Sequence, residues 1–150
     1  DVQPFIEEYM TEDADEILVG MGTLALPMRV AVRQLRSEGR KVGFLRIKWF
    51  RPFPVEELQK VLSRAKAVGV IDRDYSFGAP FHAGVLLNEV RSAMYDVEPR
   101  TPMVGFIAGL GGREITQPYA REMFALTQQA AQSGKSDNET HWIGVREDKS

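Results

Sequence analysis

Two glycines and an alanine near the start of the chain have the spacing of a dinucleotide-binding turn. Gly20, Gly22 and Ala25 follow a short apolar run in the order G-x-G-x-x-A. Such glycines let the backbone approach a pyrophosphate, and an acidic residue about 20 positions later binds the ribose. The next apolar run offers no such carboxylate, but Lys48 and Arg51 could bind the 2′-phosphate of NADP. A nucleotide site and a tight strand-to-helix joint both remain open, and a single match to this spacing favours the joint.

A second glycine cluster, GLGGREIT, occupies residues 109–116. Backbone N–H groups at Gly111 and Gly112 can form a concave nest for an anion, to which Arg113 adds positive charge. The cluster lacks the Lys-Ser/Thr pair of a Walker loop, so a nucleoside triphosphate site is not predicted. The alternative is a structural turn in which Arg113 and Glu114 face solvent or a neighbouring chain.

Two carboxylates follow another apolar run, in the sequence IDRD. Asp72 and Asp74 could share a divalent cation. However, Arg73 lies between them and no further ligand is evident, so we interpret Asp72 as a cap or as one half of an ion pair. The sequence has no G-x-S-x-G motif, and of its two histidines only His82 lies near these loops. The residue types therefore indicate contact rather than catalysis.

Strand and helix patterns alternate along the chain, and they must position these loops. Strands are predicted at residues 17–19, 41–50, 68–71 and 104–108, and helices at 24–35, 54–62, 86–94 and, after a Thr116 cap, 117–126. This order predicts an α/β fold with three layers, in which a mainly parallel sheet has helices on both faces. Ligands and partners of such sheets meet the loops at the carboxyl ends of the strands.

The composition limits the type of protein and the partners that the chain can have. The 150 residues are 43% hydrophobic and 27% charged, with a net charge of -2, which fits a globular domain. This charge predicts neither a nucleic acid nor a membrane partner. Cysteine is absent, which excludes thiolate-bound clusters in this chain and fits a cytoplasmic protein. We expect an acidic leading segment at 1–14, one domain at 15–130 and a polar, loosely held tail at 131–150, which Trp142 and Ile143 could anchor. The first residue is Asp1, so we expect a fragment or a split subunit.

Four loop sequences together carry a resemblance to a known family. They read ILVGMGT, GRKVGFLRIKWFRPFP, AVGVIDRDYSFGAP and GFIAGLGGREIT, and they fall in order between Glu7 and Met123. The chain resembles the second domain of the alpha subunit of 2-oxoacid:ferredoxin oxidoreductases, the pyruvate synthase type of enzyme. The resemblance implies a fold similar to the C-terminal domain of transketolase, with one antiparallel strand at an edge of the sheet.

The resemblance also implies what the complete enzyme does. Such enzymes use thiamine diphosphate and Mg²⁺ to decarboxylate a 2-oxoacid, pass electrons through iron–sulfur clusters to ferredoxin, and usually transfer the acyl group to coenzyme A. Other domains or chains hold these cofactors, so we expect no cofactor, metal or catalytic residue here. The expected role is assembly with thiamine-binding and iron–sulfur chains, with a homodimer as another arrangement. The alternative is a stand-alone NADP-binding module.

An assembly role predicts a contact surface on the loops. We expect Trp49, Phe50, Phe53 and Phe77 to be exposed near it. The candidate contact residues are Trp49, Arg51, Asp72, Arg73, Phe77, Gly111, Gly112 and Arg113.

Overall fold

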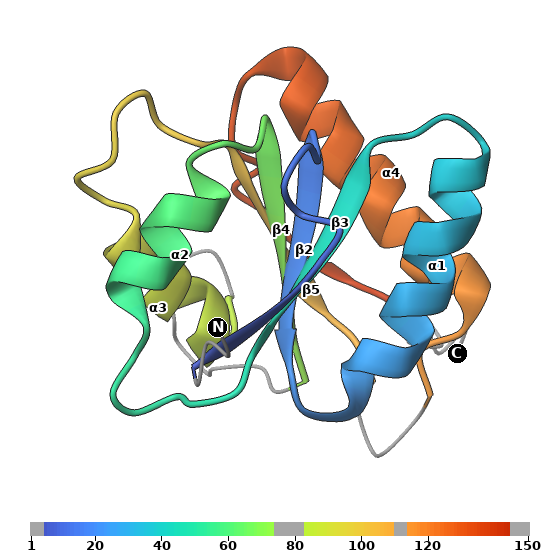
Figure 1. The fold of residues 1–150 in the computed structure, drawn as a ribbon, viewed down its shortest axis with the longest axis horizontal. Coiled ribbons are helices and arrows are strands. Elements are labelled where there is room, and N and C mark those ends of the chain that lie inside the picture. The colour runs from blue at the N-terminus through green and yellow to red at the C-terminus, as the bar shows by residue number, and fades with distance from the viewer. Residues whose placement is uncertain (1–4, 74–82, 110–113, 145–150) are drawn as a thin grey trace, which may run out of the picture.

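The structure, a computed structural model, describes residues 5–73, 83–109 and 114–144 (Figure 1). Within these residues, six strands form one sheet in the order β1-β3-β2-β4-β5-β6. The strands are β1 (Ile6–Tyr9), β2 (Glu16–Met21), β3 (Val42–Ile47), β4 (Ala67–Asp72), β5 (Met103–Ile107) and β6 (Thr140–Trp142). Strands β2 to β6 pair in parallel with one another, whereas the edge strand β1 runs antiparallel to β3. The mainly parallel sheet with one antiparallel edge strand is therefore confirmed.

Helices cover both faces of this sheet, as Figure 1 shows. The helices are α1 (Ala25–Ser37), α2 (Val55–Leu62), α3 (Val85–Ala93) and α4 (Gln117–Ser133). Helices α1 and α4 pack on one face around Phe44, Phe106 and Phe124. Helices α2 and α3 pack on the other face around residues that include Leu45 and Leu58. The three-layer α/β prediction is confirmed, and its two cores account for the strongly apolar strands.

The predicted helical faces are the buried ones. In α1 the face consists of Leu24, just before the helix, and of Met28, Ala31, Val32 and Leu35, all buried. Thr116 caps α4, because its hydroxyl oxygen accepts the N–H of Tyr119 at 3.4 Å. Helix α4 continues past the expected end at Leu126, because Thr127 and Ala130 extend its buried face by another turn.

Both ends of the described chain add strands that the apolar periodicity did not predict. Strand β1 lies in the acidic leading segment, where Ile6 is buried and Glu7 forms ion pairs with Arg29 and Arg46. Strand β6 lies in the segment expected to be a loosely held tail, and it pairs with β5. Strand β6 thus holds residues 140–142 to the sheet, and the buried Ile143 beside them anchors the segment as the sequence suggested. The three residues of β6, THW, are too few to show an alternating pattern, and pairing with β5 decides their conformation.

Candidate functional site

The carboxyl ends of the parallel strands meet at one edge of the sheet. We call this edge the strand-end face; it consists of residues 21–23, 48–51, 72–73 and 108–109. From β2 the chain crosses to β3 on one side and then returns to β4 on the other, so strand order reverses between β2 and β4. Ligands of open α/β sheets bind at such a point. A cavity of about 360 Å³ lies there, between the ends of β2 and β4 and the first turn of α3.

The glycine turn after β2 is explained by the backbone itself. Gly22 has φ +73°, a conformation that residues with a side chain rarely adopt. A Cβ atom on Gly20 would lie 2.7 Å from Cδ1 of Leu24, which folds back over the strand. A short 3₁₀ turn, η1 (Gly22–Leu24), joins β2 to α1. The joint itself therefore accounts for Gly22, whether or not a nucleotide is present, and a side chain at position 20 would require Leu24 to move.

Asp72 is turned into the protein and caps a helix. Its side chain is buried, and its two carboxylate oxygens accept the N–H groups of Leu86 at 2.8 Å and Leu87 at 3.1 Å. The backbone at Gly84 lies so close that a Cβ there would be 2.1 Å from Cγ of Asp72. The carboxylate thus satisfies N–H groups at the start of α3 that have no partner within the helix. The interpretation of Asp72 as a cap is confirmed.

The described candidate arginines lie on the strand-end face, each held by a neighbour. Arg73 donates from Nη2 to the hydroxyl oxygen of Thr23 at 2.8 Å, which bridges the ends of β4 and β2. Arg51 donates from Nη2 to Oε1 of Glu89 at 2.5 Å, and its Cζ lies 4.2 Å from the centroid of the Phe50 ring. These contacts fix the position of both guanidinium groups at the surface.

The aromatic candidates divide into exposed and buried ones. Trp49 is 56% exposed just after β3. Phe50 and Phe53 are partly buried instead, packed against the core under α2 and α3 with their rings 5.7 Å apart and edge to face. The expectation that these two phenylalanines are exposed is wrong. Sequence distance alone did not show that the loop after β3 folds back onto the core.

Other predicted residues lie outside the described part of the chain. These are Asp74, Phe77, His82, Gly111, Gly112 and Arg113. The anion nest and the Asp72–Asp74 cation site, neither of which the sequence favours, are therefore not tested by the structure. Within residues 5–73, 83–109 and 114–144, no three His, Asp or Glu side chains are grouped as a metal site would require. The helices in those ranges are too short or too polar to span a bilayer.

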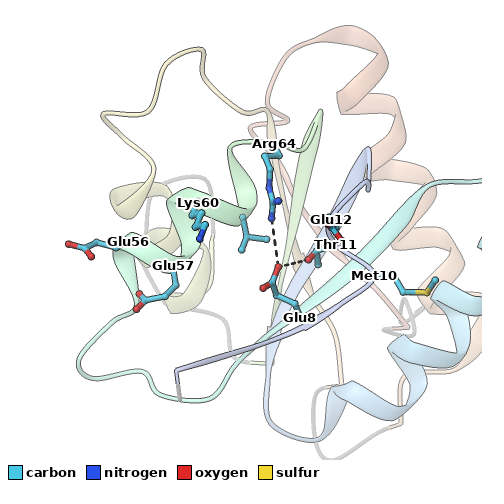
Figure 2. Close-up of a pocket in the computed structure, with 9 residues that line it drawn as sticks. Glu8, Met10, Thr11, Glu12, Glu56, Glu57, Lys60 and Arg64 are labelled. Carbon is cyan, nitrogen blue, oxygen red and sulfur yellow. Dashed lines mark hydrogen bonds and ion pairs between the residues drawn. The ribbon is translucent and has the colours of Figure 1, made fainter. Parts of the chain in front are cut away.

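Another cavity, of about 580 Å³, runs along β1, the turn after it, and α2 (Figure 2). Oε1 of Glu8 accepts the hydroxyl of Thr11 at 2.6 Å and lies 3.8 Å from Nη2 of Arg64. Figure 2 shows Glu56 pointing away from this ion pair. The charges thus do not converge on one point, and we assign no chemistry to this cavity. Sequence analysis missed it because Glu8 and Arg64 are distant in the chain.

Comparison with known protein families gives a match over most of the domain. The model of the family described as pyruvate:ferredoxin oxidoreductase core domain II matches residues 14–118. The chain belongs to this family. Strands β2 to β5, helices α1 to α3 and the whole strand-end face fall inside the matched residues of core domain II.

Individual relatives of the chain agree with this family match. The chain is 39% identical over 146 residues to ketoisovalerate oxidoreductase subunit VorA of Pyrococcus horikoshii, covering 97% of this chain and 36% of that protein. It is 38% identical over 143 residues to pyruvate synthase subunit PorA of the same organism, covering 95% and 35%. The structure of a split gene transketolase, an inactive β4 tetramer, has a TM-score of 0.60 and 20% identity, covering 84% of this chain and 41% of that one.

These comparisons confirm the resemblance stated from the loop sequences, including the likeness to a transketolase fold. The chain is a domain of the alpha-subunit type of 2-oxoacid:ferredoxin oxidoreductase. It spans little more than a third of the length of the relatives VorA and PorA. The alternative of a stand-alone NADP module is not favoured, since the family match includes the glycine turn and the joint accounts for Gly22 without a nucleotide.

Proposed function

We propose that this core domain II is a non-catalytic assembly domain of a thiamine diphosphate-dependent 2-oxoacid:ferredoxin oxidoreductase of the pyruvate type. The observation that carries the proposal is the exposed side chain of Trp49 on the strand-end face. The same loop also presents Arg51, and the loop after β4 presents Arg73. Aromatic residues and arginine are enriched at protein interfaces, where they act as anchors.

The geometry of the two arginines favours binding of a rigid partner surface. Arg51 is held by Phe50 and Glu89, and Arg73 is held by Thr23. A side chain that is already ordered loses little conformational entropy when a partner binds it. A specific interface buries roughly 800 Å² on each partner, so the contact extends beyond these side chains. We include Phe77, Gly111, Gly112 and Arg113 in the proposed contact surface, since they belong to the same loops in sequence. Asp72 contributes by holding α3 in place.

Partners and cofactors follow from the resemblance. The proposed partners are the thiamine-binding and iron–sulfur domains or subunits of the same enzyme, with ferredoxin as the electron acceptor of the whole assembly. A homodimer of the chain within the whole enzyme is a further proposed arrangement. Thiamine diphosphate, Mg²⁺ and the iron–sulfur clusters belong to those partners in this proposal. The cysteine-free composition agrees with a location of the clusters elsewhere and with a cytoplasmic enzyme.

The test is anaerobic co-purification of the tagged chain with its candidate subunits, followed by measurement of the dissociation constant. Trp49→Ala and Arg73→Glu are each expected to weaken the assembly about tenfold or more, as loss of an interface anchor does. Tyr95→Ala and Lys135→Glu are matched controls, because both residues are exposed at the opposite edge of the sheet. Circular dichroism checks that each variant is folded. Equal affinity of the Trp49 and Arg73 variants and the wild type would reject this surface.

A further inference from the structure

A third cavity lies at the opposite edge of the sheet, where β5 begins. Its volume is about 210 Å³, and its walls come from the end of α3, the loop that leads to β5, and the turn between α4 and β6. Met94 and Met103 are buried and form apolar parts of the lining. The polar groups at this cavity come from Arg91, Tyr95, Arg100, Thr101 and Ser136.

The charge of the lining is positive. Arg91 and Arg100 both contribute to it, and no Asp or Glu is among the described residues of the lining. Arg91 is partly buried, and this burial lowers the pKa of its guanidinium from the ordinary value. Cζ of Arg100 lies 5.5 Å from the centroid of the Tyr95 ring, and this cation–π contact orients its guanidinium. An anion in this cavity would meet the partly buried guanidinium of Arg91 and the guanidinium of Arg100 beside the Tyr95 ring.

The neutral side chains of the lining supply hydrogen-bond donors. The Ser136 hydroxyl oxygen accepts the N–H of Met103 at 3.0 Å, so its own proton remains to be donated. Thr101 adds a second hydroxyl. The acidic residue next to Ser136 in sequence is Asp137. Its carboxylate is already bound by Nε2 of His141 at 2.6 Å and by the N–H of Glu139 at 3.0 Å.

We propose that this cavity binds the phosphate or carboxylate group of a small molecule between Arg91 and Arg100. Guanidinium groups match both anions through paired, parallel hydrogen bonds, and hydroxyl groups of Ser136 and Thr101 complete the donor set. The site is separate from the strand-end face, so it stands independently of the assembly role. It makes the domain a binding module for an anionic ligand as well as a contact module.

The experiment titrates the chain with inorganic phosphate while sodium chloride keeps the ionic strength constant, and follows backbone amide signals by NMR. Saturable shifts are expected at Arg91, Arg100, Met103 and Ser136. Arg100→Gln, at an exposed position, is expected to raise the dissociation constant for phosphate about tenfold, as loss of a charged hydrogen-bonding partner does. Arg33→Gln on the exposed side of α1 is the charge-matched control and is expected to leave the constant unchanged.

Acetate at the same ionic strength separates the two ligand classes. Stronger binding of phosphate assigns the site to a phosphate group, and stronger binding of acetate assigns it to a carboxylate. Shifts that never saturate with either anion would overturn the proposal. So would equal affinities of the wild type, Arg100→Gln and Arg33→Gln, because the response would then reflect general charge screening.

Discussion

Replacement of Asp72 by alanine tests whether this residue serves the fold rather than a partner. The carboxylate accepts two backbone N–H groups at the start of α3, at 2.8 and 3.1 Å, from the buried residues Leu86 and Leu87. Asp72→Ala leaves both donors without this acceptor. A buried donor left unsatisfied costs about 1–3 kcal/mol, and loss of a helix cap costs about 0.5–2 kcal/mol.

The expected loss in the free energy of unfolding is about 2–4 kcal/mol for Asp72→Ala, because the cavity beside Asp72 lets water reach part of the exposed backbone. Asp72→Asn retains one acceptor oxygen, so about half of that loss is expected. Urea unfolding followed by circular dichroism measures both values. Glu12→Ala is the control: Glu12 is exposed, the change in net charge is the same, and a change within about 0.5 kcal/mol is expected.

A stability of Asp72→Ala within about 0.5 kcal/mol of the wild type would refute the capping role. A folded and equally stable variant that no longer assembles would instead place the carboxylate in the interface. The comparison therefore separates the two roles that the sequence left open for this residue.

Three further changes test other parts of the fold. Gly84→Ala places a Cβ 2.1 Å from Cγ of Asp72, so urea unfolding should show a loss of about 1–3 kcal/mol from overpacking. Thr116→Ala removes the cap of α4 and should lower the stability by about 0.5–1 kcal/mol in the same assay, while equal stability would contradict the cap. Burial raises the pKa of Asp137, but hydrogen bonds from the Glu139 N–H and His141 outweigh it, so its pKa lies below the ordinary 3.8. A lowered carboxyl pKa stabilises the fold above pH 3.8 and loses this effect as pH falls through the folded-state pKa, so melting temperatures between about pH 5 and 2 should fall less steeply for Asp137→Asn than for the wild type.

The core of the fold was predictable from the sequence, and its edges were not. Short, continuous apolar runs separated by helical patterns predicted β2 to β5. Strands that are buried on both faces carry such continuous runs. Strands β1 and β6 each contact a neighbour on one side only within the described sheet, and their sequences IEEY and THW carry no strong pattern. The antiparallel edge came from the family resemblance, while the sixth strand was not predicted.

The exposure of side chains could not be predicted where tertiary contacts decide it. The run KWFRPFP offers three aromatic side chains of similar chemistry, yet Trp49 is exposed while Phe50 and Phe53 pack against the core. Residue type does not separate these outcomes, because all three are large and apolar. The cavity between Arg91 and Arg100 was missed for a related reason: Ser136 completes its lining from a distant part of the chain.

The proposed contact role of the strand-end face is compatible with its nucleotide-like sequence. At the point where a nucleotide-binding sheet exposes its backbone, this domain uses Gly22 for the turn and Asp72 for the start of α3. Arg73 then bridges the crevice to Thr23, so its guanidinium is tied to the rim of the cavity. Trp49 and Arg51 are exposed and lie outside the lining of the cavity. Binding by a broad partner surface uses such exposed groups, whereas a nucleotide requires the lining itself.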